Sequence, residues 1–141
     1  MSAFLSFKLI IFYIYIASLY LKENIIKNKA LTKYKRTTMA QFAVIGLGSF
    51  GATVAQELTR LNHDVIGIDT VKKNVENLAD VLTHAVIADA TDEHVLDELN
   101  IQNCDAVVVA IGEDIEASIL CVLNLKNLGI DKIWVKAKTK A

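Results

Sequence analysis

A glycine-rich loop followed by a carboxylate is the part of this sequence best suited to chemistry. Gly46, Gly48 and Gly51 form a Gly-x-Gly-x-x-Gly pattern between a short apolar run and an amphipathic helical pattern. A second apolar run, residues 65–68, ends at Asp69, 18 positions after Gly51. Glycines at this spacing let the backbone approach a pyrophosphate, and the start of the following helix attracts negative charge. The pattern predicts a site that holds a nucleotide by its phosphates.

Asp69 has the right place for a ribose ligand in this pattern. Its carboxylate can accept hydrogen bonds from both ribose hydroxyls, whereas its negative charge would repel a 2′-phosphate and so disfavours NADP. ATP, ADP, AMP and NAD all carry the free diol, so Asp69 does not choose among them. The alternative interpretation is a glycine-rich turn with no ligand.

Strands and helices are expected to alternate after Met39, which predicts an α/β fold with a Rossmann-like parallel sheet and helices on both faces. The sequence contains five such strands and ends before the crossover helix and C-terminal subdomain that would follow. Strands are expected at residues 41–45, 65–69, 84–88, 106–110 and 132–135, and helices at 49–61, 72–81, 92–99 and 115–128.

In this fold the ligand lies beyond the carboxyl ends of the strands, so the loops after them are candidate binding segments. Asp89 can accept a hydrogen bond from an adenine amino group, directly or through water, and Ala90 and Thr91 can offer backbone groups to the ring edge. Ile111 and Gly112 can lie under the adenosine and its phosphates. Capping of the next helix is the alternative interpretation for Asp89 and Thr91.

Charge is divided unevenly along the chain, although the formal net charge is −1. Residues 1–38 hold seven Lys/Arg and one Glu, a net +6, whereas residues 39–141 hold eight Lys/Arg and fifteen Asp/Glu, a net −7. The acidic part is a poor candidate for binding nucleic acid. Two cysteines, Cys104 and Cys121, cannot form a disulfide framework, and both are expected in or near the core. The spacing of the histidines indicates no metal site.

The N-terminal segment has three open interpretations. Residues 4–21 are apolar with Lys8 as the sole charge, and residues 22–36 are rich in lysine. We prefer upstream sequence included by a misplaced start before Met39. A membrane anchor would leave the following domain in the cytoplasm, and a signal peptide would imply export. We therefore divide the chain into an extension, 1–38, and a nucleotide-binding domain, 39–141.

From Met39 to Lys138 the sequence resembles the RCK (TrkA-N) domain family, particularly its KtrA type. The resemblance rests on residues 43–51, 84–91, 107–112 with 116–118, and 133–137. It implies a nucleotide-sensing cytoplasmic subunit that gates a potassium channel or transporter. It also implies homodimers in an octameric ring, at the inner face of the plasma membrane beneath an integral membrane potassium-translocating subunit. ATP or ADP are the ligands implied by the KtrA type, and NAD or NADH those of the TrkA type.

The sequence departs from the family pattern at two points. Many KtrA-type domains have an arginine that faces the terminal phosphates where this chain has Ser49, so a strong preference for ATP over ADP is not expected. Lys136 could supply a compensating charge. Family members also continue into the crossover helix and a C-terminal subdomain, so a shortened chain or a natural single-lobe form is expected.

An NAD-dependent dehydrogenase domain is the alternative function. Neither a Tyr-x-x-x-Lys pair nor a histidine after a predicted strand is present to support hydride transfer, so we expect no enzyme activity. The expected nucleotide-binding residues are Gly46, Gly48, Ser49, Phe50, Gly51, Asp69, Asp89, Ala90, Thr91, Ile111, Gly112 and Lys136.

Overall fold

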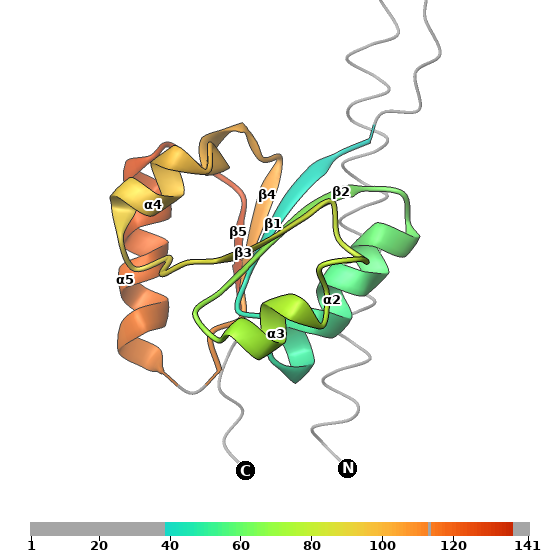
Figure 1. Cartoon of the computed structure of the whole chain (residues 1–141). Helices are drawn as coiled ribbons and strands as arrows, with labels where there is room; N and C mark the ends of the chain where they lie inside the picture. The colour runs from blue at the N-terminus through green and yellow to red at the C-terminus, as the bar shows by residue number, and fades with distance from the viewer. Residues whose placement is uncertain (1–38, 113, 137–141) are drawn as a thin grey trace, which may run out of the picture. The chain divides into compact units, whose positions relative to one another are not determined.

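The computed structural model describes residues 39–112 and 114–136 (Figure 1). The N-terminal extension, with its three interpretations, lies outside the described residues. Among those that are described, no helix is long and apolar enough to cross a membrane.

Five parallel strands form one sheet in the order β3-β2-β1-β4-β5. The strands are β1 (Gln41–Ile45), β2 (Asp64–Asp69), β3 (His84–Ile87), β4 (Ala106–Val109) and β5 (Ile133–Val135). β1 pairs with β2 on one side and with β4 on the other. The strand order therefore reverses at β1, and the expected Rossmann-like sheet is confirmed.

Helices cover both faces of this sheet, as expected (Figure 1). α2 (Ser49–Arg60) packs on β1 and β2, and α3 (Lys72–Glu76) packs on β2 and β3. On the other face, α5 (Ile115–Asn127) packs on β4 and β5, and α4 (Glu93–Glu98) packs against α5. Because alternate residues of a strand point to opposite faces, each central strand supplies both layers of the core.

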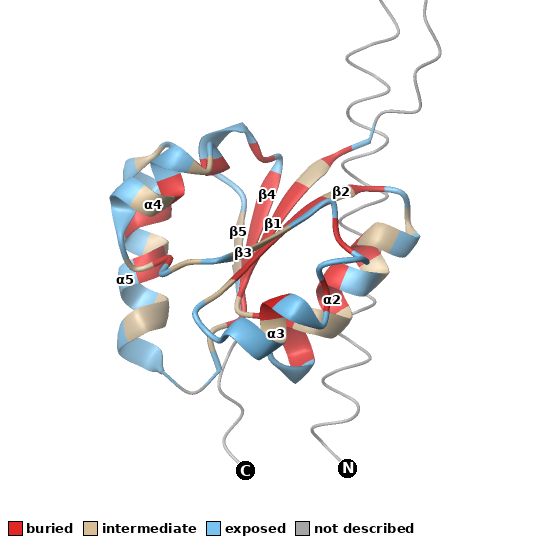
Figure 2. Cartoon of the chain, viewed as in Figure 1, coloured by how far each residue is buried: buried red, intermediate tan, exposed pale blue. Residues whose placement is uncertain are grey.

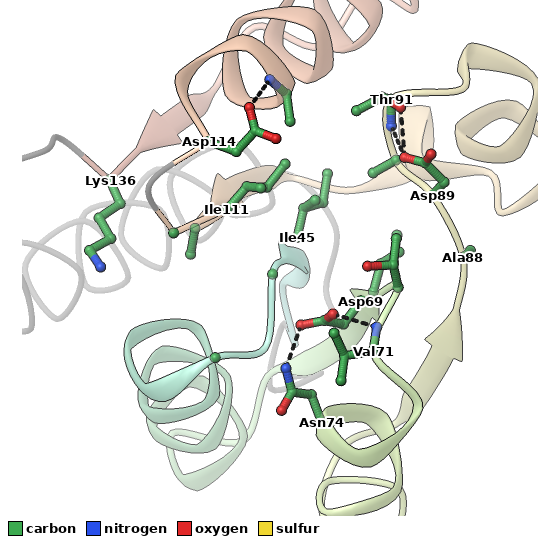
Figure 3. Close-up of a pocket in the computed structure, with 18 of the residues that line it drawn as sticks. Ile45, Asp69, Val71, Asn74, Ala88, Asp89, Thr91, Ile111, Asp114 and Lys136 are labelled. Atoms are coloured by element: carbon green, nitrogen blue, oxygen red, sulfur yellow. Dashed lines mark hydrogen bonds between the residues drawn. The ribbon is translucent and has the colours of Figure 1, made fainter.

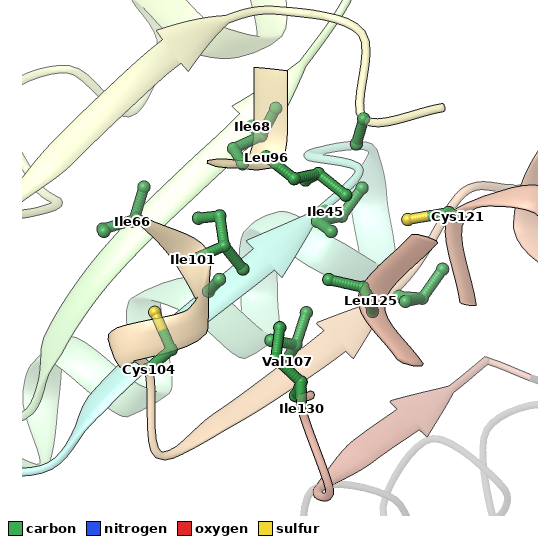
Figure 4. Close-up of a cluster of buried hydrophobic side chains, with 13 residues drawn as sticks. Ile45, Ile66, Ile68, Leu96, Ile101, Cys104, Val107, Cys121, Leu125 and Ile130 are labelled. Atoms are coloured by element: carbon green, nitrogen blue, oxygen red, sulfur yellow. The ribbon is translucent and has the colours of Figure 1, made fainter. Parts of the chain in front are cut away.

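The core between the sheet and the α4–α5 pair is continuous and apolar (Figure 4). Ile45, Ile68 and Val107 of the sheet pack in one cluster with the fully buried Leu96 and Leu125. Figure 2 shows the same division, with buried central strands and helices whose outer faces are exposed.

Both cysteines belong to that core, which confirms the sequence-based expectation. Cys121 is fully buried and Cys104 is nearly so. Burial raises the pKa of Cys104 to about 11, with a smaller effect from the charge of Asp105. Burial likewise raises the pKa of Cys121 to about 12, with a contribution from Asp89. Both thiols are therefore protonated at neutral pH, which makes them inert packing groups rather than nucleophiles.

Two local predictions differ from the structure. The helix expected at residues 72–81 ends at Glu76, and turns carry the chain from there to β3. Val75, Leu78 and Leu82 are buried along this segment, so the apolar spacing is satisfied by turns as well as by a helix. A short 3-10 helix, η1 (Ile101–Asn103), was not predicted, and it follows Asn100 in the left-handed conformation.

The end of β1 lies so close to its neighbours that side chains are excluded. Gly46 has a φ of +93°, and a Cβ there would overlap the carbonyl oxygen of Ala110. A Cβ at Gly51 would overlap the carbonyl oxygen of Gly46. These two glycines allow α2 to begin immediately beyond the sheet, next to the end of β4.

Replacing Gly51 by alanine should therefore destabilise the fold strongly. We expect Gly51→Ala to lower the free energy of unfolding by about 3 kcal/mol or more, because the added methyl group meets backbone that has no room to move. Urea unfolding followed by circular dichroism measures this change. Gly48→Ala is the matched control, since a Cβ at Gly48 has no heavy atom within 4 Å, and its cost should stay within about 1 kcal/mol. Equal losses for the two variants would contradict the packing argument.

Candidate functional site

A cleft of about 700 Å³ opens at the carboxyl ends of the strands, where the strand order reverses (Figure 3). Its walls come from the loops after β1, β2, β3 and β4, from the first turn of α2, from α3, from the first half of α5, and from the residue after β5. A parallel sheet forms such a crevice because consecutive helices leave the reversal point on opposite faces.

The structure brings nearly all of the predicted site residues together in this cleft. The lining includes Gly46, Gly48, Ser49, Phe50, Asp69, Asp89, Ala90, Thr91, Ile111, Gly112 and Lys136. Gly51 is not among the lining residues. Its contact is with the backbone of Gly46, so it shapes the loop from behind.

One end of the cleft is formed by the start of α2. The first hydrogen bond of this helix runs from the Ala52 N–H to the Gly48 carbonyl oxygen, at 2.8 Å, and Gly48 has no side chain to cap the helix. The earlier N–H groups, such as that of Ser49, have no acceptor within the helix. An anion at this position would complement both those groups and the helix dipole.

Lys136 adds a positive charge near the same loop. Its Nζ lies 5.4 Å from the centroid of the Phe50 ring, within the range of a cation–π contact. Figure 3 shows Lys136 on the opposite side of the cleft from Asp89 and Thr91. Among the described lining residues Lys136 is the one cation, against the carboxylates of Asp69, Asp89, Asp114 and Glu116.

Asp69 connects the glycine-rich loop to the turn before α3. Its Oδ2 accepts hydrogen bonds from the Leu47 N–H at 2.7 Å and from the Asn74 Nδ2 at 3.1 Å. Its Oδ1 accepts from the Val71 N–H at 2.8 Å. These bonds fix the orientation of the carboxylate at the wall of the cleft (Figure 3).

Asp89 and Thr91 form a compact turn at the other end of the cleft. Oδ1 of Asp89 accepts from the Thr91 hydroxyl at 2.7 Å and from the Thr91 N–H at 2.9 Å. These two bonds hold the pKa of Asp89 below its ordinary value, the hydroxyl having the larger effect. The alternative that Asp89 or Thr91 caps α4 is wrong, because Asp92 occupies the N-cap and accepts from the His94 N–H.

A buried amide on α5 holds this turn from behind. The Nδ2 group of Asn124, a side chain that is only 7% exposed, donates to the Thr91 carbonyl oxygen at 2.7 Å. The Asp89–Thr91 turn is thus hydrogen-bonded to α5, and the first turn of α5 forms another part of the wall of the cleft. At the start of α5, Asp114 caps the helix by accepting a hydrogen bond from the Ala117 N–H.

Sequence reasoning missed several lining residues. Asn74, Thr70 and Val71 follow Asp69 in the chain, and Glu116 and Leu120 come from the first half of α5. The signal available was positional, since residues just after a strand end at the carboxyl edge lie near the ligand crevice. In the part of the chain that the structure describes, no three His, Cys, Asp or Glu side chains gather closely enough to hold a metal ion.

Comparison with known proteins finds relatives of this chain. Ktr system potassium uptake protein A of Bacillus subtilis (strain 168) is 51% identical over 98 residues, which cover 70% of this chain and 44% of that protein. Ktr system potassium uptake protein C of the same organism is 48% identical over the same shares. The Ktr system potassium uptake protein A of Vibrio alginolyticus is 39% identical over 105 residues, covering 74% of this chain and 48% of that protein. The chain spans less than half the length of these relatives.

A solved structure supports the fold as well. The NAD(P)-binding domain of an exopolyphosphatase-related protein from Archaeoglobus fulgidus matches with a TM-score of 0.62 and 29% identity, over 70% of this chain and 73% of that one. A family model described as the TrkA-N domain matches residues 42–141, which hold the sheet except its first residue, Gln41, and every residue of the cleft. The chain belongs to the TrkA-N domain family.

Proposed function

We propose that this chain is a nucleotide-sensing regulatory component of a potassium uptake system. It binds an adenine nucleotide in the cleft and uses the binding energy to change the state of an assembly, without catalysing a reaction. The observation that carries this proposal is that one cleft contains two features that suit two parts of a nucleotide. The start of α2 suits phosphate groups, and Asp69 suits a ribose.

Potassium uptake is proposed from the relatives. Three Ktr system potassium uptake proteins are 39–51% identical over 98 to 105 residues, and the matching family model spans every residue of the cleft. The shared span covers under half of each of those proteins, so their complete activity comes to this chain only as a proposal.

ATP and ADP are the proposed ligands, with NAD or NADH as the other possibility. Asp69 suits any nucleotide with a free ribose diol and disfavours a 2′-phosphate. Ser49 brings no charge to the phosphate end, so Lys136 is the described lining cation that a terminal phosphate can meet. We therefore expect only a modest preference between ATP and ADP.

A ligand in this cleft would contact both halves of the sheet. The α2 start and Asp69 lie on the β1–β2 side, whereas Ile111 and the first turn of α5 belong to the β4–β5 side. If the two halves can adopt two arrangements, a nucleotide that binds one arrangement more tightly shifts the equilibrium toward that arrangement. The size of the shift is limited by the difference between the nucleotide's affinities for the two arrangements.

The proposed partners are a second copy of the chain, in a dimer and an octameric ring, and an integral membrane potassium-translocating subunit. The protein would then work in the cytoplasm, at the inner face of the plasma membrane. The outer face of α5 exposes Ile115, Ile119 and Leu123 at helical spacing, a larger apolar surface than isolated surface residues give. Such a surface suits contact with another protein.

The proposal is tested by calorimetric titration of the full chain with ADP, ATP, NAD and NADP. We expect the first three to bind and NADP to bind much more weakly. Incubation with NAD and a panel of alcohols should leave the nicotinamide absorbance unchanged. Tight binding of NADP, or turnover of NAD, would contradict the proposal.

Removing the Asp69 carboxylate should weaken every nucleotide that has a ribose diol. For Asp69→Ala we expect a loss of about 1–3 kcal/mol in binding free energy, the range for a hydrogen bond to a charged group. Asp64→Ala is the matched control, because Asp64 lies at the opposite end of β2 and accepts from the Thr83 hydroxyl at 3.3 Å. Unchanged ADP affinity in Asp69→Ala, or an equal loss in Asp64→Ala, would show that Asp69 is not at the ribose.

Filling the space at Gly48 should block the phosphates while keeping the fold. A side chain there has no protein atom within 4 Å of its Cβ, and Gly48 lies at the α2 start that lines the cleft. For Gly48→Val we expect binding of ADP to fall by at least ~10-fold while the unfolding transition remains cooperative. A variant that folds and still binds ADP with wild-type affinity would rule out this position for the diphosphate.

A further inference from the structure

We propose that Asn74 binds the ribose together with Asp69, each side chain accepting a hydrogen bond from one hydroxyl of the diol. The inference rests on the nucleotide-binding function proposed above and names a ligand contact that the glycine-rich motif does not include. Asn74 lies in α3 at the wall of the cleft, five residues after Asp69.

The argument begins with the number of hydrogen bonds that Asp69 can accept. A carboxylate has about four acceptor positions, two on each oxygen. The Leu47 N–H and the Asn74 Nδ2 group both donate to Oδ2, and the Val71 N–H donates to Oδ1. One position, on Oδ1, is left for a ligand.

A ribose diol has two hydroxyl groups to donate. If Asp69 accepted both, one of its existing bonds would break, either the one that holds the glycine-rich loop through Leu47 or the one that holds the α3 turn. Because the Leu47 bond is 2.7 Å long and lies beside the phosphate end, its loss would disturb the loop that the ligand needs. A second acceptor next to Asp69 avoids this cost.

Asn74 provides that acceptor. A carboxylate at neutral pH can only accept hydrogen bonds, so the Asn74 amide must present its nitrogen to Asp69, as Figure 3 shows. The amide oxygen of Asn74 is then left as an acceptor on the same half-buried side chain. The pair therefore offers two acceptors, one charged and one neutral, which matches the two hydroxyls of the diol.

Because the Asn74 side chain is uncharged, it also affects the selection between a free ribose diol and a 2′-phosphate. A lysine or arginine beside Asp69 would compensate its charge and favour a 2′-phosphate, whereas an amide leaves the negative charge in place. Asn74 thus helps Asp69 to select nucleotides with a free diol.

The test compares ADP, 2′-deoxy-ADP and 3′-deoxy-ADP by calorimetry on the full chain, in wild type, Asn74→Ala and Asn74→Leu. In wild type each deoxy analogue should bind about 3- to 10-fold more weakly than ADP, as expected for one lost hydrogen bond. In both Asn74 variants ADP should weaken by a similar factor. One of the two deoxy penalties should disappear and the other should remain.

Asn77→Ala is the matched control, because Asn77 is exposed, ends the same helix and does not line the cleft. It should keep both penalties and the affinity for ADP. Alanine favours the helix and leucine preserves the side-chain size, so a fold defect common to both variants is not expected, and thermal unfolding checks this.

Other outcomes would overturn the inference. If both penalties persist in the Asn74 variants, Asn74 does not touch the ribose, and if both fall together, Asn74 only orients Asp69. If wild type binds ADP with no deoxy penalty, the diol is not bound at all. If wild type binds no nucleotide, the proposed function fails as well, which separates that result from the others.

Discussion

The close approach of backbone segments at the end of β1 is the constraint on which the rest of the structure depends. Gly46 lies against the carbonyl group of Ala110, and Gly51 lies against that of Gly46. No side chain fits at either contact, so β1 and β4 end side by side and α2 begins beside both. The cleft exists because this crowding leaves the helix start, and not a side chain, at the edge of the sheet.

Asp69 uses that geometry in two ways. Its bond to the Leu47 N–H holds the glycine-rich loop in place, and the residue also lines the cleft. Because Asp69 supports the loop and is also proposed to bind the nucleotide, nucleotide binding is proposed to affect the conformation of the glycine-rich loop. The turn at Asp89 and Thr91 is held differently, by a hydrogen bond from the buried Asn124 of α5.

Much of this architecture could be predicted from sequence, because buried strands and glycine spacing leave strong local patterns. The five strands lie within one or two residues of their expected positions, since β-branched runs such as residues 106–109 suit a sheet buried on both faces. The early end of α3 at Glu76 was not predictable, because its buried residues have spacing that a helix and a series of turns satisfy equally well.

The residues of the cleft likewise fall into those that the sequence predicts and those that it does not. The strand-end residues that form the cleft were predicted, because the fold fixes where strands end. Asn74 and Asn124 were missed, because their roles depend on a hydrogen bond to a particular acceptor rather than on any pattern in the chain. Asp92 was not predicted as the cap of α4, because Asp89 and Thr91 are also residue types that cap helices.

A crystal structure of the full chain with ADP tests the central claim most directly. The account predicts the diphosphate against the N–H groups at the start of α2, the ribose within hydrogen-bond distance of Asp69 and the adenine beside the Asp89–Thr91 turn. ADP bound outside the cleft, or bound in reverse with its phosphates toward Asp89, would contradict it.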